Sequence, residues 1–164
     1  MKRGRHWTSA DGRFGATMPP LVCDAIEEHI RSAHPHETGG VLAGRYDDAL
    51  SVAILTEVSG PPPDSLAGHT WFQRGTKHLA AWMKSLWSKP MRQYYLGEWH
   101  YHPARHVEPS PDDVEQMEEI AASPKYNCPE PLMFIFGESK RAPRIVRVFV
   151  HPRGSGLIEL REIR

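Results

Sequence analysis

Three stretches of the chain carry apolar residues at the spacing of a helix that buries one face. In the first stretch Val22, Ile26 and Ile30 recur every four residues, and prolines stand on both sides of it, where they prevent a helix from continuing. The second stretch ends at a proline, and the third begins with Ser110 and Pro111, which are favoured where a helix starts. The predicted helices are 21–33, 76–88 and 111–122.

Runs of aliphatic and aromatic residues between these helices predict strands. Two of the runs are separated by Asp47 and Asp48, which predict the turn of a hairpin. Segment 60–68 contains three consecutive prolines and is predicted to be a surface loop. The predicted strands are 38–45, 50–58, 93–102, 132–136, 145–150 and 156–163. Alternating strands and helices predict an α/β fold, a single domain over residues 1–164 with helices packed on a central mixed sheet.

Composition excludes several classes of protein. The 20 basic and 20 acidic side chains give a formal net charge of zero, which gives no electrostatic reason to expect nucleic acid or an anionic membrane as a partner. The chain has no apolar run long enough to span a bilayer, and no apolar segment follows its basic start as in a signal peptide. The two cysteines, Cys23 and Cys128, lie in no CxxC spacing, which favours free thiols in the cytoplasm.

The residues that carry chemistry are concentrated between positions 98 and 113. His100 and His102 are two apart in a predicted strand, so both imidazoles face one side, as two ligands of one zinc ion do. Asp113 lies in the first turn of the helix 111–122, where a carboxylate is stabilised, and it is the candidate third ligand. Ser110 to Asp113 is also a good helix start, and the two interpretations are compatible.

Six residues of the chain match the signature of the JAMM, or MPN-plus, zinc metalloproteases at every required position. They are Glu37, His100, His102, Pro103, Ser110 and Asp113. The similarity spans roughly residues 21–136, and the sequence Gly-Glu-Trp-His-Tyr-His-Pro resembles the bacterial branch found in antiphage and integrative-element operons. Tyr101 departs from the small residue usual between the histidines, and we expect it to face away from the metal.

The resemblance implies a cytidine-deaminase-like JAMM fold, a hydrolase activity and a role for each residue. His100, His102 and Asp113 would hold one zinc ion, whose bound water is the nucleophile. Glu37 would take the proton of that water and pass it to the leaving amine. Ser110 would donate a hydrogen bond to the developing oxyanion. The substrate would be the bond after the C-terminal glycine of a ubiquitin-like modifier or its conjugate, with E1-like and E2-like enzymes as partners.

Other classes of protein fit less well. A cupin also uses a His-x-His pair, but Glu108 stands at the wrong distance and helices are prominent. A metallo-β-lactamase needs His-x-His-x-Asp-His, which Pro103 interrupts. The remaining alternative is an MPN-like scaffold that binds partners without catalysis, although such relatives lack the glutamate or a metal ligand. His106 is a poor candidate for a fourth ligand, because it would close the open position that a catalytic zinc needs.

The way in which a substrate tail is held can also be predicted. An extended tail that ends in glycine commonly binds by adding a strand to an exposed sheet edge. We expect segments 61–68 and 104–109 to form the two walls of a narrow channel. Such a channel would admit glycine and reject a side chain that carries a Cβ.

Overall fold

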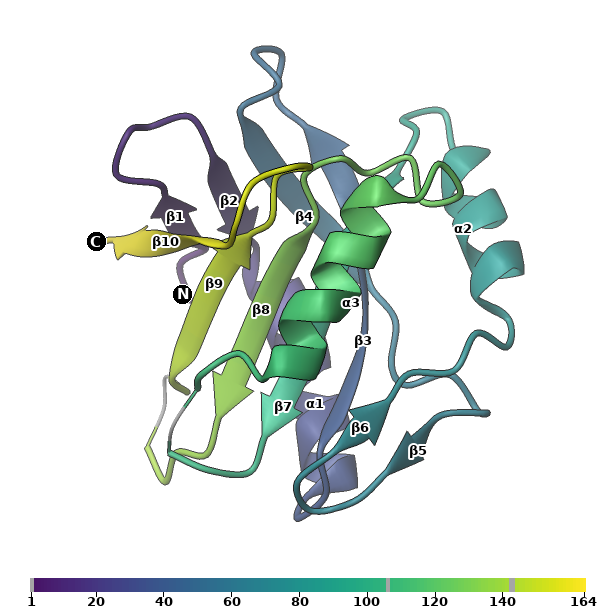
Figure 1. The fold of residues 1–164 in the computed structure, drawn as a ribbon, viewed down its shortest axis with the longest axis vertical. Coiled ribbons are helices and arrows are strands. Elements are labelled where there is room, and N and C mark those ends of the chain that lie inside the picture. Colours follow the sequence, from purple (N-terminus) through teal and green to yellow (C-terminus); the bar gives the residue numbers. More distant parts are fainter. Residues whose placement is uncertain (1, 106, 142–143) are drawn as a thin grey trace.

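The computed structural model describes residues 2–105, 107–141 and 144–164. Eight strands in these ranges form one mixed sheet that closes on itself, in the order β1-β10-β9-β8-β7-β3-β4-β2 (Figure 1). The strands are β1 (Arg5–Thr8), β2 (Gly15–Met18), β3 (Thr38–Tyr46), β4 (Val52–Val58), β7 (Tyr94–His102), β8 (Leu132–Gly137), β9 (Val146–Val150) and β10 (Ile158–Ile163). Most neighbours are antiparallel, whereas β7 runs parallel to β8 and β2 parallel to β4.

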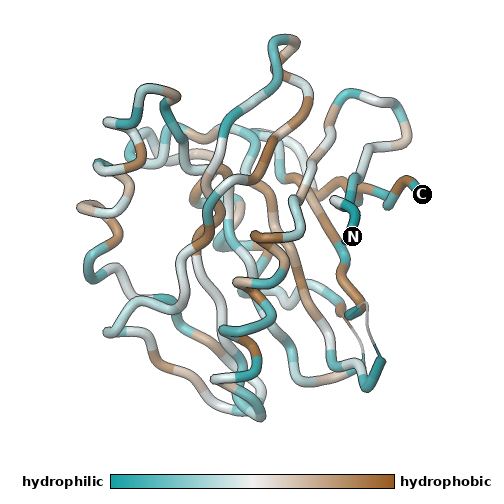
Figure 2. Tube along the Cα trace, turned by 180° about the vertical axis from the view of Figure 1, so that it is seen from behind, coloured by the Kyte–Doolittle hydropathy of each residue, from teal (hydrophilic) through white to brown (hydrophobic). Residues whose placement is uncertain are grey.

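Two helices cover opposite faces of this sheet. Helix α1 (Pro20–Ala33) buries Ile26 and Ile30 in the larger core, together with the inner face of the strands. Helix α3 (Pro111–Ala122) lies across β7 and β8 on the other face (Figure 1). Its residues Met117 and Ile120 pack there against Met133 and neighbouring apolar side chains. The hydrophobic segments run along the strands between the two helices (Figure 2).

A third helix and a small hairpin extend from this framework. Helix α2 is Leu79–Trp87, and strands β5 (Leu66–Ala67) and β6 (Phe72–Gln73) form a separate antiparallel pair. The prediction that segment 60–68 is entirely loop is therefore wrong at its end. Helix α2 is shorter than the predicted 76–88, because His78 before it has a left-handed φ of 69°. Only Leu86 of this helix is buried.

The predicted elements are all present, and their ends differ from the prediction by at most three residues. The central mixed sheet is confirmed, with the correction that it is a closed barrel. Strands β1 and β2 were not predicted, and they close it by pairing with β10 and β4. Trp7, Ala16 and Met18 of these strands are buried in the core. Strands of four residues are too short to show a clear alternation in the sequence.

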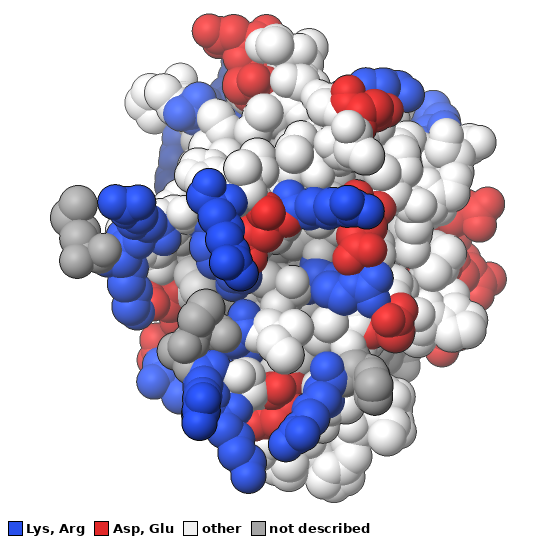
Figure 3. Space-filling model, turned by 90° about the vertical axis from the view of Figure 1, so that its left-hand side faces the viewer, with Lys and Arg blue, Asp and Glu red and all other residues white. Residues whose placement is uncertain are grey.

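Charged side chains of both signs are mixed on the surface. On the side formed by β1, β10 and β9, lysine and arginine lie beside aspartate and glutamate (Figure 3). Ion pairs such as Arg5–Glu162 at 2.7 Å and Arg147–Glu159 at 2.8 Å account for part of this pattern. Cys23 and Cys128 are free thiols, as predicted. Within the described ranges, every helix is too short or too polar to cross a membrane.

Candidate metal centre

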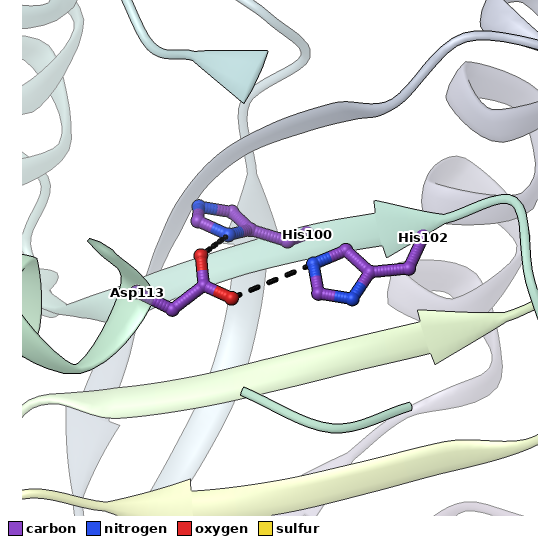
Figure 4. Close-up of side chains that lie close together, drawn as sticks. All are labelled: His100, His102 and Asp113. Atoms are coloured by element: carbon purple, nitrogen blue, oxygen red, sulfur yellow. Dashed lines mark hydrogen bonds and ion pairs between the residues drawn. The ribbon is translucent and has the colours of Figure 1, made fainter. Parts of the chain in front are cut away.

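The end of β7 and the first turn of α3 bring His100, His102 and Asp113 together (Figure 4). Both imidazoles lie on the face of β7 that α3 covers, and the carboxylate of Asp113 lies between them. Nδ1 of His100 is 2.9 Å from Oδ1 of Asp113, and Nε2 of His102 is 3.5 Å from Oδ2. One candidate ligand atom from each of the three residues lies within 4.8 Å of the others. The sequence pattern thus corresponds to one cluster in space.

Close packing of β3 against β7 fixes the position of His100. Gly39 of β3 is the direct partner of His100 in the antiparallel ladder. A Cβ at Gly39 would lie 2.5 Å from the carbonyl oxygen of Trp99 and 2.8 Å from Cδ2 of His100. Only glycine allows this approach of the two strands. Gly39, the first of the two glycines that follow Thr38, therefore has a direct structural reason.

The start of α3 orients the carboxylate of Asp113. Oγ of Ser110 accepts a hydrogen bond from the Asp113 N–H at 3.1 Å, and Oδ2 of Asp113 accepts one from the Ser110 N–H at 2.9 Å. Burial alone would raise the pKa of Asp113, but hydrogen bonds with His100 and His102 and from the Ser110 backbone outweigh it. The pKa lies far below its usual range, so the group is a carboxylate at neutral pH.

The donor set at this centre fits a zinc ion. Two imidazoles and one carboxylate are ligands that zinc favours, and three protein ligands leave a position for substrate or water. Nε2 of His100 is buried and has no hydrogen-bond partner in the described part of the chain. Nδ1 is the His100 nitrogen that faces Asp113. Buried polar atoms are normally satisfied, so an imidazole with a free nitrogen at this centre supports a ligand role for His100. The assignment of these residues as ligands stays a prediction.

Glu37 lies immediately before β3, beside the cluster. Its side chain is half-buried, and its N–H donates a hydrogen bond to the carbonyl oxygen of Gly68 at 2.8 Å. Burial raises the pKa of Glu37, and the charge of Asp113 raises it further, while His102 and His100 oppose the shift. The charges of all three residues therefore act on the Glu37 carboxyl group. A raised pKa brings a carboxyl group nearer to the pH at which it can both accept and donate a proton.

The match to known families includes this whole site. Residues 20–149 match the family described as prokaryotic homologs of the JAB domain. The chain belongs to this family. That membership confirms the resemblance to JAMM proteins found in the sequence. Glu37, Ser110 and the three clustered residues all lie within the matched segment.

Two proteins similar to this JAB chain extend the comparison. One is named CD-NTase/cGAS isopeptidase, from Enterobacter hormaechei subsp. hoffmannii (strain UCI 50). It is 43% identical over 148 residues, which are 90% of this chain and 78% of the relative. The other is a solution structure of a protein from Desulfitobacterium hafniense, with a TM-score of 0.64 and 20% identity over 85% of this chain and 86% of that one. This second similarity supports the fold alone.

Three features of the JAB site were not predicted from the sequence. The Phe72 ring of β6 packs edge-on against His100, with ring centroids 5.7 Å apart. Glu98 of β7 is completely buried, and Arg74 lies 2.8 Å from its carboxylate. The position of Glu98, two residues before His100 in a buried strand, could have indicated a need for a partner. No pattern in the sequence pointed to Arg74 or Phe72.

The remaining histidines and the tyrosine between the ligands have other surroundings. Tyr101 faces away from the cluster, as expected, and its hydroxyl contacts Nδ1 of His34 at 2.9 Å and donates a hydrogen bond to Glu138. His36 is exposed and lies against His69, with ring centroids 4.7 Å apart. His106, the less favoured fourth ligand, lies outside the described residues.

Proposed function

We propose that this chain is a zinc-dependent isopeptidase that hydrolyses the bond after the C-terminal glycine of a ubiquitin-like modifier or its conjugate. The cluster of His100, His102 and Asp113 beside the half-buried Glu37 carries the proposal. Membership of the JAB family and likeness to a relative named an isopeptidase support it. By the same likeness, conjugates of a CD-NTase are the proposed substrate class. We also propose that the protein acts in the cytoplasm, with E1-like and E2-like enzymes of an antiviral pathway as partners.

The three clustered residues would hold one zinc ion. The chemistry that zinc supplies when bound is a lower pKa for water and polarisation of a carbonyl group. Asp113 contributes a carboxylate that stays ionised, because its hydrogen bonds hold its pKa low. His100 contributes a buried nitrogen that has no other partner in the described ranges. Packing against Gly39 and Phe72 keeps the His100 ring in place.

Glu37 moves the proton in the proposed reaction. Its carboxylate accepts a proton from the attacking water and then delivers it to the nitrogen of the leaving amine, which cannot leave as an anion. Burial supports this role, because it raises the pKa of Glu37 and so makes its carboxylate a stronger base towards the attacking water. The hydrogen bond from its N–H to Gly68 fixes the backbone from which the side chain extends.

Ser110 can serve as helix cap and as hydrogen-bond donor at once. Its oxygen accepts the Asp113 N–H, and its own hydroxyl proton remains free to donate. We propose that it donates to the carbonyl oxygen of the scissile bond as negative charge develops there. One such donor typically contributes about 3 kcal/mol to stabilisation of the transition state.

The β5–β6 hairpin is the proposed binding element for the substrate tail. Gly68, in the turn between its strands, is joined to Glu37, so the hairpin lies beside the proposed base. An extended tail could add a strand to this small sheet. Segments 61–68 and 104–109, the second of which includes His106 outside the described residues, would form the walls of a channel that only glycine passes. The constriction would make the terminal glycine a requirement for cleavage.

Cleavage of a defined conjugate tests the proposal against the non-catalytic alternative. The substrate is a ubiquitin-like protein joined through its C-terminal glycine to a fluorescent amine. We expect wild type to bind one zinc per chain and to cleave this bond. Glu37→Gln should keep zinc, melting temperature and substrate affinity, and lose at least about a hundredfold in kcat. Wild-type protein that binds the modifier and zinc without cleaving would support the scaffold alternative.

A further inference from the structure

The β5–β6 hairpin and the residue that follows it contact the metal centre and its strand β7 at three points. The carbonyl of Gly68 accepts the Glu37 N–H at 2.8 Å, and Phe72 packs edge-on against His100. One residue beyond β6, Arg74 enters the interior and lies 2.8 Å from Glu98. The first two contacts involve residues of the proposed reaction. The third is a charged pair with no place in that reaction.

The pair between Arg74 and Glu98 is almost entirely buried. The side chains are 5% and 0% exposed, and Nε of Arg74 faces Oε2 of Glu98 as an ion pair without hydrogen-bond geometry. Arg74 also donates to the hydroxyl of Tyr126 at 2.9 Å and to the carbonyl of Gly75 at 2.8 Å. The hydroxyl of Tyr95 donates to the second oxygen of Glu98 at 2.7 Å. Glu98 itself lies in the middle of the sheet, where β7 pairs with both β3 and β8. Arg74 is therefore attached to a strand that is hydrogen-bonded on both sides.

A buried ion pair is a poor way to gain stability. Removing two charges from water is costly, and apolar residues of similar size often stabilise a protein as well or better. A hairpin that needed only attachment could pack an apolar side chain at position 74. What an ion pair adds is a fixed relative position, because the two charges face each other in one register and are left unpaired in others.

The spacing of the contacts matches such a register. Phe72 and Arg74 are two residues apart, as are His100 and Glu98. In extended chains, residues two apart face the same side. Phe72 lies on His100 while Arg74 lies on Glu98, so the two contacts form together. A shift of the hairpin that broke the ion pair would also move Phe72 off the proposed ligand.

We infer that Arg74 and Glu98 are positioning residues, which fix the β5–β6 hairpin on the metal strand and so hold Phe72 against His100 and Gly68 against Glu37. The consequence for catalysis rests on the proposed function. The consequence for the hairpin does not, and it can be measured without any substrate. Neither residue contacts a reacting atom in this scheme.

The test variant removes both charges without leaving one alone. Arg74→Met/Glu98→Gln keeps similar volumes and preserves an acceptor for the Tyr95 hydroxyl. The matched control is Arg5→Met/Glu162→Gln, which removes an ion pair between β1 and β10 at 2.7 Å. Amide hydrogen exchange is followed for the Glu37 N–H and for segment 66–73. Zinc affinity is measured by competition with a chelator, and kcat/KM on the tailed substrate.

We expect the test variant to fold and to bind zinc with an affinity within threefold of wild type. Exchange in the hairpin and at Glu37 should be faster by about tenfold or more, since these amides would open locally. Loss of correct placement should lower kcat/KM by about tenfold. The control should change neither quantity. Arg74→Lys, which keeps a point charge but not the planar fork, should fall between wild type and the test variant.

The outcomes separate the inference from the function. Unchanged exchange in a folded, zinc-binding test variant overturns the positioning role, whether or not wild type cleaves. Faster exchange with unchanged kcat/KM overturns its consequence for catalysis. Faster exchange in a protein whose wild type never cleaves supports the positioning role while the proposed function fails. If the test variant does not fold, the same exchange measurement is made on Arg74→Lys. Hairpin amides that exchange at the wild-type rate in Arg74→Lys would then overturn the inference.

Discussion

Ser110 has two proposed roles that one pair of substitutions can separate. As the N-cap of α3, it accepts the Asp113 N–H at 3.1 Å. Alanine would remove this acceptor at a cost of about 1 kcal/mol, whereas asparagine caps a helix about as well as serine. In a domain of this length, about 1 kcal/mol corresponds to a fall of about 2–4 °C in melting temperature. We therefore expect Ser110→Ala to melt a few degrees early and Ser110→Asn to melt like wild type.

The oxyanion role predicts a different pattern in the kinetics. Neither alanine nor asparagine places a hydroxyl group where the serine has it, so both variants should lose kcat by about a hundredfold or more. Thermal unfolding followed by circular dichroism, and kcat at saturating substrate, measure the two effects on the same samples. Zinc content is the control, because Asp113 shares the cap with Ser110. A Ser110→Asn variant with full zinc and wild-type kcat would refute the oxyanion role and leave only the helix cap.

Three further predictions concern the metal, the strand contact and the tail. Alanine at His100, His102 or Asp113 should remove zinc, and elemental analysis that finds one zinc in Asp113→Ala would contradict the ligand set. Gly39→Ala should destabilise the fold by about 1–3 kcal/mol in thermal unfolding, because its Cβ would lie 2.5 Å from a backbone oxygen of β7; an unchanged melting temperature would contradict the contact. Shortening segment 60–68 should lower kcat/KM with zinc retained, and an Ala-terminated tail should resist cleavage. Equal cleavage of Gly- and Ala-terminated tails would refute the channel.

The elements that the sequence predicted well are those with long, regular patterns. Val22, Ile26 and Ile30 mark one face of α1, and all three are buried. The closure of the sheet could not be predicted, because β1 and β2 have four residues each and their partners outside this hairpin, β10 and β4, lie far away in the chain. Strands of two residues, such as β5 and β6, have no period to detect.

In the candidate site, too, the residues with a regular sequence pattern were predicted and those without one were missed. The three clustered residues were predicted because strand alternation and a helix start each constrain where a side chain points. Arg74 was missed because it follows a short strand in an irregular segment, where no periodic signal exists. Glu98 stands in a predicted strand, so the sequence could have prompted a search for a basic residue that balances its charge. That search would still have needed the fold to choose among the arginines.

The helix start and the metal centre are parts of one arrangement. One carboxylate oxygen of Asp113 accepts the Ser110 N–H, and the other lies 2.9 Å from His100. The cap therefore holds the carboxylate in place independently of the histidines. The capping box would serve the helix of a scaffold equally well, whereas a buried His100 Nε2 that lacks a partner among the described residues gives such a scaffold no benefit. An unsatisfied buried nitrogen typically costs about 1–3 kcal/mol, a cost that a ligand bound to the His100 imidazole would offset.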